Sequence, residues 1–392
     1  MKKILLFLFL SIFPILFFSQ NNRTGKSEEI KLIKTEVNKN IETLGLIMSL
    51  AIEEEIFTSW FSKSAHLLRF YLKEFQKFKQ HPAVIKAKYL FENDIFGWGS
   101  QTQGLYFSEL PEFKIKYELP KDEQYGQIYK LTQKEIDIEL KDFYSKAKDF
   151  YFDAKLDSFF LANNKVYEKI IDEIKTSLPD NNLISSMESY HGVKMAGYKI
   201  IPSLFIPNYI NNGERITTDS GIINYFVLGP HEDIAIDSNS NETSLLKLKG
   251  FGFKNKDHLT NMGIHEFGHT FIRLFIYIPD NLKLTKSLSF LYTKALSDNM
   301  LKWGYGSWEA CFEEHLVRLC ELRIAKLMEN KKRERQILKE YYKKEKFIYL
   351  PQLNQIIIEY ESNRNKYKKI EDFLPKIIEK MAKIDTNVVK VK

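Results

Sequence analysis

The stretch GIHEFGHTF, residues 263–271, decides how the rest of the chain is interpreted. His265 and His269 are four residues apart, so on a helix they project from one face and can share one metal ion. Glu266 follows the first histidine and would lie at the open side of that metal. There it could take a proton from the water that the metal activates. The competing interpretation is an ordinary helix with surface or core histidines.

The residues around the motif favour a helix. In KDHLTNMGIHEFGHTFIRLFIYI, residues 256–278, Asp257 is a possible N-cap and Pro279 marks the expected end. Phe267, Phe271 and Ile272 are expected to form the core face of this helix. The motif therefore has the helical setting that its metal-binding interpretation requires.

Two histidines do not complete a catalytic zinc site, which normally has three protein ligands and water. The longer pattern with a further glycine and a third histidine is excluded, because Ile272 and Phe275 occupy those positions. A glutamate on a second helix is the other common solution. The sequence offers YGSWEACFEEHLVRLCELRIAKL, residues 305–327, as that helix.

Three glutamates of this second helix compete for the role of third ligand. Glu309 and Glu313 fall inside the apolar arc of the helix, while Glu314 lies at its margin. Burial favours the first two, since an unpaired buried carboxylate would be costly. The local pattern EHLV, a glutamate followed shortly by apolar residues, favours Glu314 instead. Glu314 is our first choice, and Glu309 and Glu313 stay open as alternatives.

Other polar residues near this helix are candidates for stabilising the oxyanion of a tetrahedral intermediate. They are Tyr305, His315 and Arg318. Tyr305 lies on a glycine-flanked turn, WGYGSW, and is our candidate catalytic residue beside Glu266; simple loop packing is the alternative. His191, His231 and His258 receive no role.

The order of predicted elements is helices, a short β region and helices again. We expect a strand within 29–40, then helices over 40–55 (capped by Asn40), over 64–80, from Pro82 onward and over 132–177. Residues 197–208 and 221–230 are β-rich, and NNGER, residues 211–215, is expected to be a loop between them. Residues from about 283 onward are again helical. We therefore expect an α+β, mostly helical fold.

The N-terminus is typical of a secretory signal peptide. Two lysines precede the apolar run 4–18, which is shorter than the roughly 20 residues of a membrane span. We expect cleavage near Ser19–Gln20, a secreted or periplasmic protein, and no stable membrane anchor. The predicted organisation is 1–19 signal peptide, 20–180 mainly helical region and 181–392 catalytic region.

The charge pattern excludes one class of partner. The net charge is +7, but stretches such as KKRERQILKEYYKKEK, residues 331–346, carry both signs and indicate solvated helix rather than a nucleic-acid surface. Cys311 and Cys320 would be roughly 13 Å apart on one helix, too far for a disulfide between them. We expect both thiols to be packed as small apolar groups.

With HEFGH and a glutamate-bearing helix tens of residues later, the chain resembles the gluzincin branch of zinc metallopeptidases. Residues 185–325 also resemble a domain-of-unknown-function family of secreted bacterial proteins. The resemblance implies a zincin-like small sheet packed on the motif helix, with a cleft along an edge strand that would be NYFVLGP, residues 224–230. It implies that His265, His269 and Glu314 are zinc ligands and that Glu266 is the general base.

The predicted function is that of a secreted zinc-dependent metallopeptidase acting on a peptide or protein substrate. Two alternatives stay open at this point. One is a catalytically inactive binding or structural protein on a zincin-like scaffold. The other is a zinc hydrolase that acts on non-peptide amides. Neither the substrate nor the oligomeric state follows from the sequence.

Overall fold

The computed structural model describes residues 32–52, 65–97, 99–119, 131–180, 182–236 and 242–386. They belong to one compact unit that runs from residue 31 onward. As predicted, the fold is α+β and mostly helical. The expected signal peptide lies outside the described residues, and the boundary near residue 180 stays a prediction. In the part of the chain that the structure describes, no helix has the length and apolar character that crossing a bilayer requires.

The sheet has four strands in the order β1-β2-β4-β3. They are β1 (Ile33–Thr35), β2 (Gly197–Pro202), β3 (Asn211–Thr218) and β4 (Gly221–Leu228). The first three in spatial order, β1, β2 and β4, are parallel, and β3 pairs antiparallel with β4 at the edge.

Two expectations about this sheet were wrong. NNGER begins strand β3 rather than a loop, and β4 is an interior strand rather than the edge. An edge strand has one paired side, so β3 forms with only Ile216 buried and without apolar alternation.

The helices between β1 and β2 follow the predicted pattern, with different boundaries. They are α1 (Lys39–Ala51), α3 (His66–Phe75), α4 (Pro82–Glu92), α5 (Gln133–Asp153), α6 (Leu156–Ala162), α7 (Asn164–Lys175) and α8 (Asn182–His191). The N-cap of α1 is Asn38, not Asn40, because the Asn38 side chain accepts the hydrogen bond from Ile41 N–H. Asn40 is buried inside the helix, where its amide instead holds the 3₁₀ segment η2 (Ser100–Tyr106) through Gly104 O.

The helices after the sheet build the second half of the unit. They are α9 (Glu242–Leu245), α10 (Lys256–Ile276), α11 (Pro279–Lys286), α12 (Lys294–Met300), α13 (Trp308–Leu327), α14 (Lys331–Ile337), α15 (Leu350–Ile356), α16 (Ile358–Ser362) and α17 (Leu374–Met381). Helix α10 carries the HEFGH motif, and its N-cap is Asn255 rather than Asp257, since Asn255 accepts from His258 N–H. Pro279 begins α11 directly after it, where a missing N–H costs nothing.

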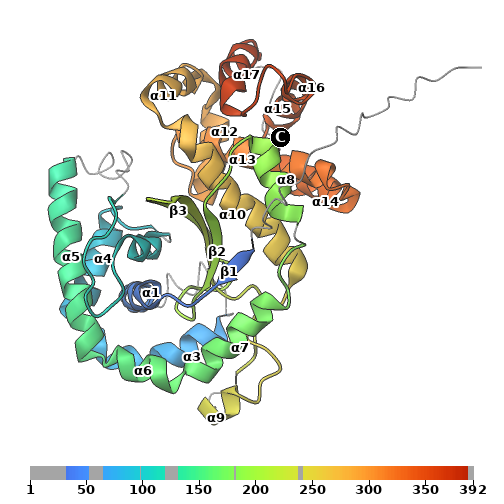
Figure 1. Cartoon of the computed structure of the whole chain (residues 1–392). Helices are drawn as coiled ribbons and strands as arrows, with labels where there is room; N and C mark the ends of the chain where they lie inside the picture. Colours follow the sequence, from blue (N-terminus) through green and yellow to red (C-terminus); the bar gives the residue numbers. More distant parts are fainter. Residues whose placement is uncertain are drawn as a thin grey trace, which may run out of the picture. The chain divides into compact units, whose positions relative to one another are not determined.

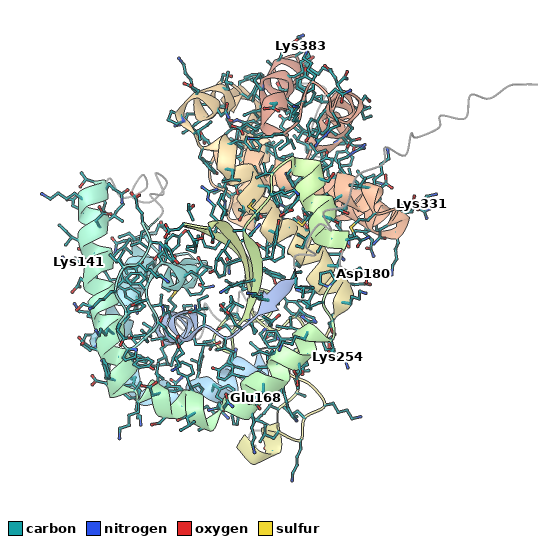
Figure 2. The ribbon with its side chains drawn as sticks, in the orientation of Figure 1. Lys141, Glu168, Asp180, Lys254, Lys331 and Lys383 are labelled. Carbon is teal, nitrogen blue, oxygen red and sulfur yellow. The ribbon has the colours of Figure 1, made fainter. Side chains whose placement is uncertain are left out.

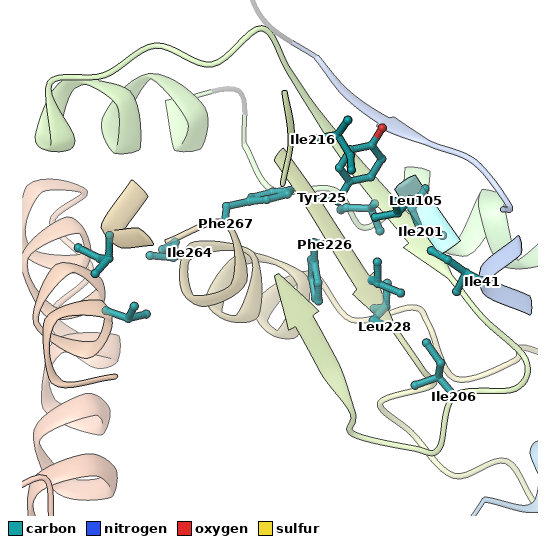
Figure 3. Close-up of a cluster of buried hydrophobic side chains, with 14 of the residues drawn as sticks. Ile41, Leu105, Ile201, Ile206, Ile216, Tyr225, Phe226, Leu228, Ile264 and Phe267 are labelled. Carbon is teal, nitrogen blue, oxygen red and sulfur yellow. The ribbon is translucent and has the colours of Figure 1, made fainter. Parts of the chain in front are cut away.

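The sheet is covered on both faces, with α10 on one and the N-terminal helices on the other (Figure 1). Figure 3 shows Phe226 and Phe267 between the sheet and α10, and Ile41, Leu105 and Tyr225 on the opposite side. The rings of Phe226 and Phe267 lie 6.1 Å apart in an edge-to-face arrangement. This packing fixes the motif helix against strand β4.

The charged side chains labelled in Figure 2 lie at the outside of the unit and are exposed; they are Lys141, Glu168, Asp180, Lys254, Lys331 and Lys383. Cys311 and Cys320 are free and buried, as predicted. Buried histidines, glutamates and arginines gather around the motif, and such buried polar groups require partners.

Candidate metal centre

Two hydrogen bonds to a buried side chain of β4 set the position of α10 on the sheet. Asn224 of β4 is completely buried, and its amide donates to the carbonyl oxygen of Phe267 at 3.0 Å. The same side chain accepts a hydrogen bond from Thr270 Oγ1 at 2.9 Å. Because a buried amide without partners would be costly, these bonds specify the rotation and height of α10 relative to β4.

The edge strand β3 crosses α10 at the motif itself. A methyl group built on Gly213 would lie 2.0 Å from the carbonyl oxygen of Glu266, so only glycine allows this approach. Arg273, two turns further along α10, donates to the carbonyl oxygen of Gly213 at 3.4 Å. The side chain of Glu266 therefore starts next to the edge of the sheet.

The imidazoles of His265 and His269 meet through their Nε2 atoms, which are 3.3 Å apart. Each Nδ1 atom is bonded to a buried carboxylate: His265 to Glu321 at 2.7 Å and His269 to Glu313 at 2.6 Å. A neutral imidazole that donates from Nδ1 presents an acceptor lone pair at Nε2. Two such lone pairs directed at one point are satisfied by a shared proton or a metal ion.

Glu314 is the glutamate that reaches this point. Its carboxylate oxygens lie 3.4 Å from Nε2 of His269 and 3.9 Å from Nε2 of His265. Glu313 contacts the far side of His269 instead. Glu309 lies half-buried in the first turn of α13, and among the described residues it has no polar contact with either histidine. Burial does not separate the candidates, because α13 is buried on almost every side and its apolar arc does not define one inner face. The choice of the third ligand stays a prediction.

An arginine donates a hydrogen bond to each of the three carboxylates around the histidines. Arg273 donates to Glu313 at 2.7 Å, Arg333 donates to Glu321 at 2.9 Å, and Arg318 donates to Glu314. Two tyrosine hydroxyls complete this outer layer, Tyr277 on Glu313 at 2.6 Å and Tyr341 on Glu321 at 3.1 Å. Sequence reasoning missed Glu321, Arg273, Arg333 and the two tyrosines; it singled out Arg318, but as a candidate for stabilising an oxyanion rather than as the partner of Glu314. The available signal was the spacing of Glu314 and Glu321, seven residues apart on one helix and therefore on one face.

The electrostatics of the cluster follow from these pairs. Burial alone would raise the carboxyl pKa values, but Arg273 holds the pKa of Glu313 well below its usual range, and Arg318 lowers the pKa of Glu314. Burial opposes protonation of His265, yet the carboxylate of Glu321 outweighs it and raises the pKa to about 8. The lowered pKa values keep Glu313, Glu314 and Glu321 ionised, and Glu314 places its carboxylate beside the two Nε2 atoms, which is an environment for a cation.

Arg318 lies inside a cage of aromatic rings next to Glu314. Its guanidinium carbon is 3.9 Å from the ring centre of Phe347 and 4.7 Å from that of Tyr341. The hydroxyl of Tyr305 lies 3.4 Å from Nη2 of Arg318, so Tyr305 stands at the border of the centre. Burial and the charge of Glu314 raise the pKa of Tyr305, which keeps this hydroxyl a donor at neutral pH.

The remaining histidines lie apart from the centre. His315 is buried and bonded to the Cys311 carbonyl at 2.7 Å, so it serves helix packing. His191 stacks on Phe271 with ring centres 4.3 Å apart. His231 and His258 stack on each other at 4.5 Å.

His265, Glu266 and His269 form a buried group that could hold a metal ion, with one ligand atom from each within 4.8 Å of the others. The donors are imidazole nitrogens and carboxylate oxygens, which suit zinc and neighbouring divalent first-row metals. The fit is supported by the orientation of the histidines, since metal-bound imidazoles usually donate their other N–H to a carboxylate or carbonyl.

Comparison with known families supplies one match. Residues 33–380 match the model of a domain of unknown function, DUF4932. The chain belongs to this family. The match spans the sheet, α10 and α13, so this DUF4932 chain contains the whole histidine–glutamate cluster within its family domain. Searches of curated proteins and of solved structures found no match.

Proposed function

We propose that this DUF4932 protein is a secreted zinc-dependent metallopeptidase of the gluzincin type. The observation that carries the proposal is the convergence of His265 Nε2, His269 Nε2 and the Glu314 carboxylate, with both Nδ1 atoms tied to carboxylates. Three protein ligands with a supporting outer layer are the composition of a catalytic zinc site. Bound zinc would polarise the scissile carbonyl and make water acidic enough to be deprotonated near neutral pH.

Three residues of the chain would have separate roles in the hydrolysis. Glu266 accepts a proton from the attacking water and passes it to the leaving amine. Tyr305 donates a hydrogen bond to the oxyanion that forms on the carbonyl oxygen. Arg318 holds Glu314 in place and is itself held by the rings of Phe347 and Tyr341.

The edge strand β3 supports a peptide rather than another amide as substrate. Extended peptides bind by adding a strand to an exposed sheet edge, and β3 is the strand beside Glu266. Arg273 and Tyr106 already donate to the carbonyls of Gly213 and Arg215. Each of these carbonyls keeps a second lone pair for a substrate N–H. A zincin-like arrangement of sheet and motif helix is part of this proposal.

The decisive experiment compares the parent protein with Glu266→Gln and Tyr305→Phe. Both variants should keep about one zinc per chain. A peptide library should show hydrolysis by the parent, none by Glu266→Gln, and a rate reduced by about 10²-fold or more in Tyr305→Phe, the usual loss for one oxyanion donor. Hydrolysis retained in Glu266→Gln would overturn the mechanism. A zinc-replete parent that cleaves no peptide would favour an inactive binding protein, or, if it cleaves other amides, a hydrolase of that class.

A further inference from the structure

The α10-facing side of the edge strand carries two polar side chains with unpaired buried atoms. Side chains alternate along a strand, and Gly213 faces Glu266, so Asn211 and Arg215 face α10 as well. Oδ1 of Asn211 and Nη1 of Arg215 are buried, and within the described ranges neither atom has a hydrogen-bond partner. Buried polar atoms in native proteins are nearly always paired, so these two atoms are available to a further polar group.

The register of the sheet locates Arg215. It pairs with Asn224, whose amide bonds the Phe267 carbonyl and the Thr270 hydroxyl on α10. Arg273 approaches the same face of β3 through its bond to Gly213. Arg215 therefore lies beside the motif helix, two strand residues from the point where Gly213 touches Glu266.

No carboxylate of the surrounding elements pairs with Arg215. Glu313 is occupied by His269, Arg273 and Tyr277. Glu214 points to the opposite face, where its acceptors are occupied by Thr102, Tyr106 and the backbone N–H of Arg215. In the part of the chain that the structure describes, no ion pair with Arg215 lies within 4.0 Å. A guanidinium in this position offers a planar fork that matches an incoming carboxylate.

We infer that Arg215 binds a carboxylate of the substrate and that the protein selects peptides with Asp or Glu about two residues from the cleaved bond. The inference rests on the proposed peptidase function. An extended peptide advances about 3.3 Å per residue, so two strand residues from Gly213 correspond to two substrate residues from the bond beside Glu266. A peptide that pairs antiparallel with β3 runs in the opposite direction, which places the acidic residue on the N-terminal side of that bond.

The test measures binding separately from hydrolysis. The zinc-loaded Glu266→Gln protein would be used to select from a random peptide library, beside the double variants that add Arg215→Gln or Arg215→Glu. Addition of Arg335→Gln, an exposed arginine of α14, is the control for the loss of one positive charge. A charge-assisted hydrogen bond contributes about 1.5–3 kcal/mol, so Asp and Glu should be enriched by about tenfold or more at one position.

The expected pattern is enrichment with the single variant and with the Arg335 control, loss with Arg215→Gln, and a change to Lys or Arg with Arg215→Glu. Equal enrichment with Arg215→Gln would overturn the inference. So would the absence of acidic enrichment, or of any bound peptide. Peptides selected in this way are then offered to the protein with Glu266 intact. Binding without hydrolysis would contradict the proposed peptidase function while the role of Arg215 in binding stands.

Discussion

Nδ1 of His269 lies 2.6 Å from Oε1 of Glu313, and Nε of Arg273 lies 2.7 Å from the same oxygen. One carboxylate oxygen thus joins His269 to an arginine four residues further along the same helix. His265 has the corresponding chain through Glu321 to Arg333. The two carboxylates orient both histidines through their Nδ1 atoms, which leaves the Nε2 atoms free to face one another and Glu314.

The third ligand is the first point to test. Glu314→Ala should lose bound zinc, because its carboxylate is the one placed beside both Nε2 atoms. Glu309→Ala should retain about one zinc per chain and serves as the matched control on the same helix. Metal content after dialysis against a weak chelator measures the difference. Zinc retained in Glu314→Ala and lost in Glu309→Ala would show that the third ligand is Glu309, about one turn nearer the start of α13.

The outer carboxylates should affect metal affinity without being ligands. Glu313→Gln and Glu321→Gln each keep an acceptor for the histidine but remove its charge, so zinc affinity should fall by about 10–100-fold. Chelator competition gives the affinity, and circular dichroism confirms that the helices persist. Zinc affinity equal to that of the parent in both variants would show that these contacts only pack α10 against α13.

Gly213→Ala should separate the edge strand from the motif helix. The added methyl group would meet backbone atoms of Glu266, the nearest at 2.0 Å, and backbone cannot rotate away. Overpacking of this kind costs about 1–3 kcal/mol in the free energy of unfolding. Gly197→Ala is the control, because nothing lies within 4 Å of the corresponding methyl group in β2. Urea unfolding of both variants measures this cost. Equal midpoints would mean that β3 shifts away from α10 without loss of stability.

Glu42 should make stability depend on pH. Burial raises the pKa of its carboxyl from 4.5 to about 8, although the N–H of Leu204 donates to it and opposes the shift. The folded state therefore holds this proton more tightly than the unfolded state. Stability from this group is greatest below pH 4.5 and falls as pH rises towards 8. At 1.4 kcal/mol per pKa unit the total is on the order of 5 kcal/mol at most.

Glu42→Gln keeps an acceptor for Leu204 but cannot ionise. Its free energy of unfolding should exceed that of the parent by an amount that grows between pH 5 and pH 8, by a few kcal/mol. Denaturant melts at several pH values measure this difference. Glu168→Gln, at an exposed position, should follow the parent at every pH. A Glu42→Gln curve parallel to the parent curve would show that Glu42 ionises normally in the folded protein.

The sequence by itself determined the elements with strong local signals. Helices α10 and α13 form where apolar periodicity and helix-ending residues predicted them, and the i, i+4 spacing of His265 and His269 brings the two rings together on any helix. The mostly helical α+β class also followed from this pattern. Local periodicity is sufficient for such features because they depend on neighbours along the chain.

Only the tertiary structure decided which residues surround the two histidines of the motif. Strand β3 has little apolar alternation and forms because β4 offers hydrogen bonds at the edge of the sheet, which no local pattern encodes. Glu314 rather than Glu309 faces the histidines because α13 is enclosed on nearly all sides, so its rotation is set by the docking of α10. Glu321 meets His265 across 56 residues of sequence, and Arg273 meets Glu313 across 40, and such contacts depend on packing between helices.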